Sequence, residues 1–99
     1  MYYYNGLGVP QDLAAALSWY RKAAERNNAM AQYSIGIMYR NGKGVPQDYV
    51  LAHFWLNVAA AQESMVKADA AHFRDELAAK MTPAQIEEAQ KMAREWKPK

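Results

Sequence analysis

The sequence predicts an all-α fold, an α/α solenoid built of antiparallel helix pairs. The first observation is an internal repeat, because residues 5–12, NGLGVPQD, return 36 positions later as residues 41–48, NGKGVPQD. Half of the aligned positions are identical when residues 1–24 are compared with residues 37–60. The second observation is that apolar residues recur at helical spacing around these glycine-rich segments. A fixed period of about 20–50 residues is typical of solenoids, whose units bury their apolar faces against one another.

The complete copy of the repeat begins with a helix that is expected over residues 29–41. Its inner positions recur at helical spacing and are Ala31, Ile35, Met38 and Tyr39. Gly36 lies inside this helix, where glycine costs about 1 kcal/mol relative to alanine. We therefore expect Gly36 to let a neighbouring helix approach closely.

Residues 41–46 are expected to reverse the chain, because Gly42 and Gly44 can take positive φ angles without steric cost. Val45 is apolar and is expected to reach the core from this loop. Pro46 and Asp48 indicate the start of a second helix, over residues 47–61. Its inner stripe is Ala52, Trp55 and Ala59, and Trp55 is expected to be buried between the two helices of the repeat.

The first copy of the repeat is partial. Residues 1–4 correspond to the final turn of a first helix, residues 5–10 to the glycine-rich loop, and residues 11–26 to the second helix. The positions equivalent to the inner stripe are Ala16, Trp19 and Ala23. Asn27 or Asn28 is expected to end this helix, because asparagine tolerates the left-handed conformation.

A different helical pair follows the repeats and is expected to cap the solenoid. One helix is predicted over residues 64–80, with the apolar stripe Val66, Ala70, Phe73 and Leu77. The last helix is predicted over residues 83–96, because residues 82–85, TPAQ, form a capping box. Its stripe is Ile86, Ala89, Ala93 and Trp96. The expected division of this single domain is 1–27 for the truncated repeat, 28–62 for the complete repeat and 63–99 for the cap.

Composition excludes several classes of function. The formal net charge of the 99 residues is only +2, with acidic and basic residues interleaved, so no nucleic-acid partner is implied. Cysteine is absent, which excludes disulfides and thiolate chemistry. No apolar run is long enough to span a membrane, and the first residues do not form a secretory signal. The chain is expected in the cytoplasm, or in the periplasm if it is a fragment of a longer solenoid, which the position of Met1 inside a repeat suggests.

The complete repeat resembles the Sel-one-like repeat family, a relative of the tetratricopeptide repeat. The residues that carry the resemblance are Ala31, Ile35, Gly36, Tyr39, Gly42, Gly44, Val45, Asp48, Ala52, Trp55, Ala59 and Ala60. The first copy matches the same pattern from Tyr3 onward, although Asn27 stands where the family usually has glycine. The resemblance implies an α/α solenoid that acts as a protein-interaction adaptor, often in bacteria, without shared catalytic residues and without a cofactor.

The candidate partner-binding residues lie on the first helix of the complete repeat. Tyr33, Ile37 and Arg40 lie away from the inner stripe, and this helix lines the concave groove in solenoids of this kind. Tyrosine and arginine are also favoured at interface hot spots. Tyr2, Tyr4 and Asn41 are added to this candidate set.

Two other kinds of site are less favoured by the sequence. Asp69, His72, Asp75 and Glu76 share one helical face that could hold a divalent metal, but a solvated polar stripe explains them better, so no metal is expected. His53 has no partner at a spacing that suggests catalysis. We therefore do not expect an enzyme.

The sequence leaves two functions open. In the first, the chain is an adaptor that binds a peptide or protein partner through the concave surface. In the second, the chain self-associates as a homodimer, because the truncated first helix leaves apolar residues uncovered. The residues expected at this self-association face are Tyr2, Tyr3, Tyr4, Ala16 and Trp19. The solution mass distinguishes the two functions.

Overall fold

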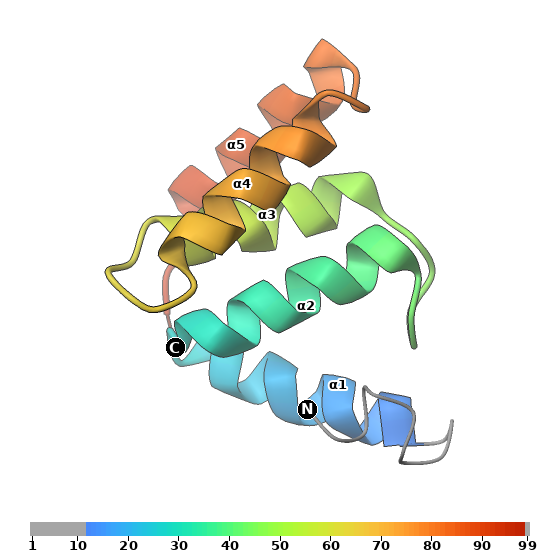
Figure 1. Ribbon diagram of the computed structural model, residues 1–99, viewed down its shortest axis with the longest axis vertical. Coiled ribbons are helices and arrows are strands. Elements are labelled where there is room, and N and C mark those ends of the chain that lie inside the picture. Colours follow the sequence, from blue (N-terminus) through green and yellow to red (C-terminus); the bar gives the residue numbers. More distant parts are fainter. Residues whose placement is uncertain (1–11, 99) are drawn as a thin grey trace.

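The computed structural model of the chain describes residues 12–98, and in this range it contains five helices and no strand (Figure 1). In chain order the helices are α1 Asp12–Glu25, α2 Ala29–Asn41, α3 Tyr49–Ala60, α4 Lys67–Ala78 and α5 Pro83–Glu95. The all-α prediction is therefore confirmed, while the expected loop over residues 5–10 lies outside the described range. Helix α3 packs against α2, α4 and α5, whereas α1 packs against α2 at one end of the molecule.

Local backbone chemistry sets most of the helix ends. Asn27 follows α1 with a left-handed φ of 74°, and Asn28 caps α2 by accepting a hydrogen bond of 2.9 Å from the backbone nitrogen of Ala31. Gly42 and Gly44 have φ angles of 70° and 77°, as the sequence predicts. Since both angles are positive, residues with a Cβ atom would be strained there.

Two helix starts differ from the prediction. Helix α3 begins at Tyr49, because Asp48 is its N-cap and accepts a hydrogen bond of 3.0 Å from Leu51 N. Pro46 therefore lies in the loop before the cap rather than in the first turn. Helix α4 begins at Lys67 rather than at residue 64, and the residue at its N-cap, Val66, is buried and offers no capping side chain.

The contact between α2 and α3 depends on Gly36. A Cβ atom at this position would lie 2.8 Å from Cγ of Leu56 and 3.3 Å from the backbone oxygen of Ala52. A distance of 2.8 Å between carbon atoms is well inside van der Waals contact. Gly36 therefore lets α3 approach closely, as expected.

Trp55 is buried, as predicted, with 9% of its surface exposed. Its ring contacts, however, are with Phe54, at 4.7 Å between centroids, and with Trp96, at 6.1 Å in an edge-on arrangement. Trp55 belongs to the core cluster of the molecule, and Trp96 packs against this cluster. Leu56 meets Gly36 at the contact between α2 and α3, and Trp55 reaches the residue after α5.

The C-terminal pair covers α3 and so closes the core. The residues that α4 and α5 bury completely or almost completely are Ala70, Leu77 and Ala89. The capping box is confirmed, because Gln85 N donates to Thr82 Oγ1 at 3.1 Å and Thr82 N donates to Gln85 Oε1 at 3.0 Å. This pair therefore plays the part of a cap that the sequence predicts.

Candidate functional site

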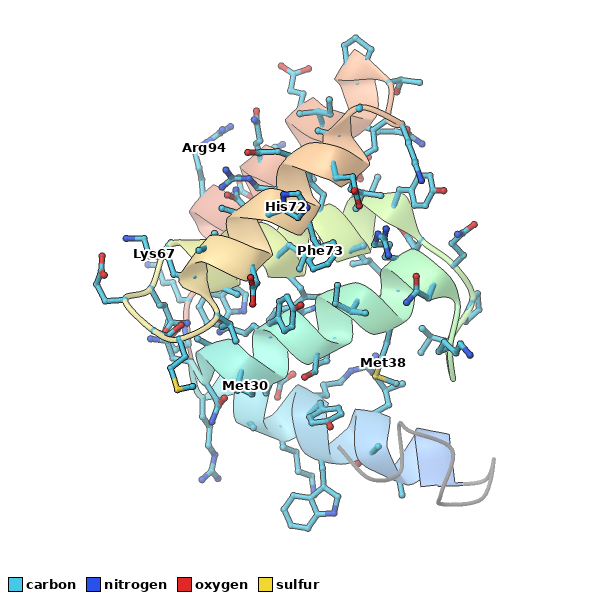
Figure 2. All side chains as sticks on the ribbon, viewed as in Figure 1. Met30, Met38, Lys67, His72, Phe73 and Arg94 are labelled. Atoms are coloured by element: carbon cyan, nitrogen blue, oxygen red, sulfur yellow. The ribbon has the colours of Figure 1, made fainter. Side chains whose placement is uncertain are left out.

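The predicted binding residues of α2 lie beside α4. Tyr33, Ile37 and Arg40 are half-buried and follow one face of the helix, with spacings that bring them onto successive turns. Phe73 of α4 contacts two of them, with its ring centroid 6.2 Å from that of Tyr33 and 5.2 Å from Cζ of Arg40. Figure 2 shows Phe73 directed from α4 toward α2. The structure thus joins residues from two helices in one surface.

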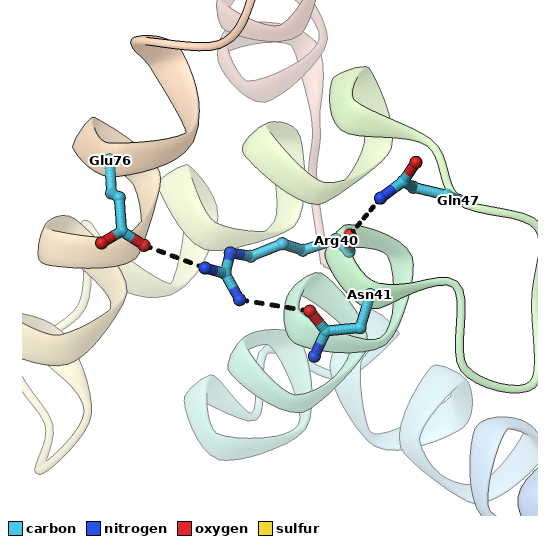
Figure 3. A network of polar contacts seen from close by, with 4 residues as sticks. All are labelled: Arg40, Asn41, Gln47 and Glu76. Carbon is cyan, nitrogen blue, oxygen red and sulfur yellow. Dashed lines mark hydrogen bonds and ion pairs between the residues drawn. The ribbon is translucent and has the colours of Figure 1, made fainter.

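Arg40 is held in place by a network of polar contacts (Figure 3). Its Nη2 pairs with Glu76 Oε1 at 2.9 Å, and its Nη1 donates to Asn41 Oδ1 at 3.1 Å. The backbone oxygen of Arg40 accepts a hydrogen bond of 2.9 Å from Gln47 Nε2. The ion pair is partly exposed, with 26% and 44% of the two side chains accessible, so it adds little stability. Its effect is to orient the guanidinium over Phe73.

We call the set formed by Tyr33, Ile37, Arg40, Phe73 and Glu76 the α2–α4 surface. The sequence indicates the three residues of α2 but assigns Phe73 to the inner stripe of α4 and Glu76 to a solvated stripe. The only sequence signal for the ion pair between Arg40 and Glu76 is that two predicted helices carry side chains of opposite charge. Tyr2 and Tyr4, which belong to the predicted set, lie outside the described residues.

The acidic stripe of α4 does not converge on a metal site. Asp69, His72, Asp75 and Glu76 are all exposed. Two of their carboxylates have partners, since Asp75 accepts from Arg74 Nε at 3.0 Å and Glu76 pairs with Arg40. Within residues 12–98 no group of three metal-ligating side chains lies close enough to hold an ion.

His53 is the buried histidine of α3, with 3% of its surface exposed. Its Nδ1 has no hydrogen-bond partner among the described residues. Burial lowers the pKa of His53 below its ordinary value of 6.5, the positive charge of Arg74 lowers this pKa further, and Asp75 opposes the shift. His53 is therefore neutral in the folded chain near pH 7 and packs as a core residue.

The residues expected at a self-association face differ in how much of their surface is exposed. Trp19 is exposed, with 74% of its surface accessible, as the truncated repeat predicts. The expectation for Ala16 is wrong, because this residue is only 4% exposed. Tyr2, Tyr3 and Tyr4 lie outside the described residues.

The helix pairs, their glycine-rich turn and the capping pair define the class of protein as an α/α solenoid. A sequence model of the Sel1 repeat matches residues 1–28 and 29–64, which is more than half of the chain. The chain therefore belongs to the Sel1 repeat family, the Sel-one-like repeats that its sequence resembles. No curated protein and no solved structure gives a significant match.

The family match indicates the general kind of activity. Sel1 repeats are generally protein–protein interaction modules, and the family is a non-catalytic repeat. None of the helices in residues 12–98 is long and apolar enough to cross a membrane.

Proposed function

We propose that this chain is an adaptor that binds a peptide or protein segment on the α2–α4 surface. The observation that carries the proposal is the group of side chains around Phe73. Tyr33 and Arg40 both contact this ring, and all three side chains remain partly accessible to solvent. Aromatic and arginine side chains dominate binding energy at protein interfaces, so their presence on one half-buried strip supports a binding role.

The ion pair between Arg40 and Glu76 supports the same proposal through preorganisation. Because the guanidinium is already oriented, a partner would not have to immobilise it on binding. The charges of this pair also offset each other, so the strip favours an apolar or aromatic anchor in the partner over a strongly charged one.

Site-specific photo-crosslinking tests the proposal. A photo-reactive residue in place of Tyr33 is expected to trap a partner in cells that express the chain, and the same residue in place of Lys91, which is exposed on α5, is expected not to. Adding Arg40→Ala to the first variant should reduce the yield of that product. Equal trapping at both positions would contradict a role for the α2–α4 surface.

Self-association is a second candidate function, and the exposure of Trp19 favours it. A two-fold contact would cover this indole with the same surface of another copy. Light scattering on the purified chain tests this candidate. A mass of 11.2 kDa at micromolar concentration would reject it.

A further inference from the structure

The tryptophan of α1 is far more exposed than the equivalent tryptophan of the second repeat. Trp19 and Trp55 occupy the same repeat position, 36 residues apart. Trp55 is 9% exposed and lies edge-on to Trp96, whereas Trp19 is 74% exposed. In the second repeat, this position is thus covered by an aromatic side chain, that of Trp96, at the end of α5. Tryptophan is enriched among the residues that dominate binding at protein interfaces, so its exposure here makes this face a candidate for an interaction.

Two adjoining hollows flank the exposed face of α1. The larger, of about 600 Å³, is lined by Trp19, Lys22, Ala23, Glu25 and Arg26. The smaller, of about 270 Å³, is lined by Leu17, Ser18, Arg21, Lys22 and Glu25. Their shared residues are Lys22 and Glu25, so the hollows are parts of one surface, which we call the Trp19 face.

The charge of the Trp19 face is positive. Among the described residues that line the hollows, Arg21, Lys22 and Arg26 contribute three positive charges and Glu25 contributes one negative charge. Arg21 donates a hydrogen bond of 2.9 Å to the hydroxyl of Tyr39, whereas Lys22 and Arg26 form no ion pair with any other described residue. Two cations beside an exposed indole are therefore available to a partner.

We propose that the Trp19 face binds an acidic segment of another protein, anchored by an aromatic or large aliphatic side chain. The anchor would cover the indole of Trp19 as Trp96 covers Trp55, and carboxylates next to it would pair with Lys22 and Arg26. The exposure of Trp19 alone is compatible with the second copy considered above, but charge favours an acidic segment, because a two-fold contact at this face brings the same basic side chains toward each other. The Trp19 face is separate from the α2–α4 surface, so the two can be tested independently.

Fluorescence anisotropy with labelled peptides tests the proposal on the full chain. The main probe is a short acidic peptide with one central tryptophan. Two matched probes have alanine in place of that tryptophan, or lysine in place of each acidic residue. Only the first is expected to bind, and binding should weaken as salt is added because the flanking contacts are ionic. Binding of the basic peptide in preference to the acidic one would overturn the proposal.

Variants of the chain locate the peptide. Trp19→Ala should weaken binding by at least about tenfold. Lys22→Glu combined with Arg26→Glu should weaken binding to a similar degree, and added salt should no longer weaken it further, because salt then screens repulsion rather than attraction. Met65→Ala and Lys91→Glu are matched controls, because Met65 is 91% exposed and Lys91 is exposed on α5. Both controls should bind like the wild type. Circular dichroism verifies that each variant is folded. We expect the substitutions to leave the fold intact, because all the replaced side chains are exposed.

Two other occupants give distinct results. A dimer by light scattering that Trp19→Ala converts to a monomer would assign the face to a second copy and overturn the proposal. Binding to vesicles of anionic lipid, with none to the acidic peptide, would assign it to a membrane surface and also overturn it. Loss of peptide binding in Tyr33→Ala but not in Trp19→Ala would place the peptide on the α2–α4 surface instead.

Discussion

Gln62 donates a hydrogen bond of 2.6 Å from its Nε2 to Oε1 of Gln32, and so ties the segment after α3 to the interior of α2. Gln32 is fully buried, and its own Nε2 donates to the backbone oxygen of Ala24 at 3.0 Å. One buried amide therefore connects α1, α2 and the segment that follows α3.

Gln32→Leu is expected to lower the free energy of unfolding by about 1–3 kcal/mol. The amide of Gln62 loses its partner, and the carbonyl of Ala24 keeps only its hydrogen bond from Asn27 N. Urea denaturation followed by circular dichroism measures the change. Gln90→Leu is the control, since Gln90 is exposed on α5. Equal stability of the two variants would show that water replaces the lost hydrogen bonds.

Gly36→Ala is expected to destabilise the fold by about 1–3 kcal/mol through overpacking, even though alanine is the better helix former. The new Cβ atom would lie 2.8 Å from Cγ of Leu56. A double-mutant cycle with Leu56→Ala identifies the cause. If the clash is the reason, the two substitutions together should cost less than the sum of their separate effects. Additive effects would contradict this explanation.

Gly44→Val is expected to cost more than about 1 kcal/mol, because a β-branched residue opposes the positive φ angle of 77°. Gly44→Asn is the matched variant and should cost clearly less, since asparagine tolerates the left-handed region. Melting temperatures of the two variants provide the test. A valine variant as stable as the asparagine variant would show that the loop adopts another conformation in solution.

Acid is expected to destabilise the chain through His53. Because burial lowers the pKa of this histidine in the folded state, the unfolded chain binds a proton more readily. The contribution of neutral His53 to stability is complete above pH 6.5, the ordinary pKa, and is lost as the pH falls through that value toward the lower pKa of the folded state. Arg74 adds to the effect, and Asp75 reduces it.

Chemical denaturation from about pH 8 down to about pH 5 measures this dependence. His53→Gln should reduce the slope of stability against pH. His72→Gln is the matched variant, because it removes the exposed histidine of α4. A slope that His53→Gln leaves unchanged would contradict the assignment.

Trp55→Ala is expected to cost about 3–5 kcal/mol, which threatens the folding of a small domain. Its indole packs against Phe54 and Trp96 in the core. Trp19→Ala is the matched variant, since it removes the same side chain from the equivalent repeat position. It should leave thermal stability nearly unchanged, and a comparable loss in both variants would show that Trp19 is also buried in solution.

Features with local causes could be predicted from the sequence. The left-handed glycines at 42 and 44 and the capping box at Thr82 each depend on a few neighbouring residues, and the structure confirms them. Gly36 is also interpretable, because a glycine inside a helix needs a packing reason. The start of α4 is not predictable in this way, since Val66 provides no capping side chain.

Contacts between side chains of different helices could not be predicted from the sequence to the same degree. Arg40 and Glu76 lie 36 residues apart, and their pairing depends on where α4 sits against α2. The same is true of Phe73, whose spacing fits an inner stripe but whose ring contacts Tyr33. Helical periodicity indicates which face of a helix is apolar, but it does not say which neighbouring helix that face meets.

Some helices pack against more neighbours than others, and this difference also determines which parts of the chain unfold locally first. Among the described helices α3 contacts three neighbours, whereas α1 has its main contact with α2. Backbone amides of α3 should therefore exchange with solvent deuterium only through global unfolding, while those of α1 exchange through a local opening of lower free energy. A partner that binds α1 would slow hydrogen exchange in α1 first. The end of the solenoid would then gain order on binding, while the capped core stays unchanged.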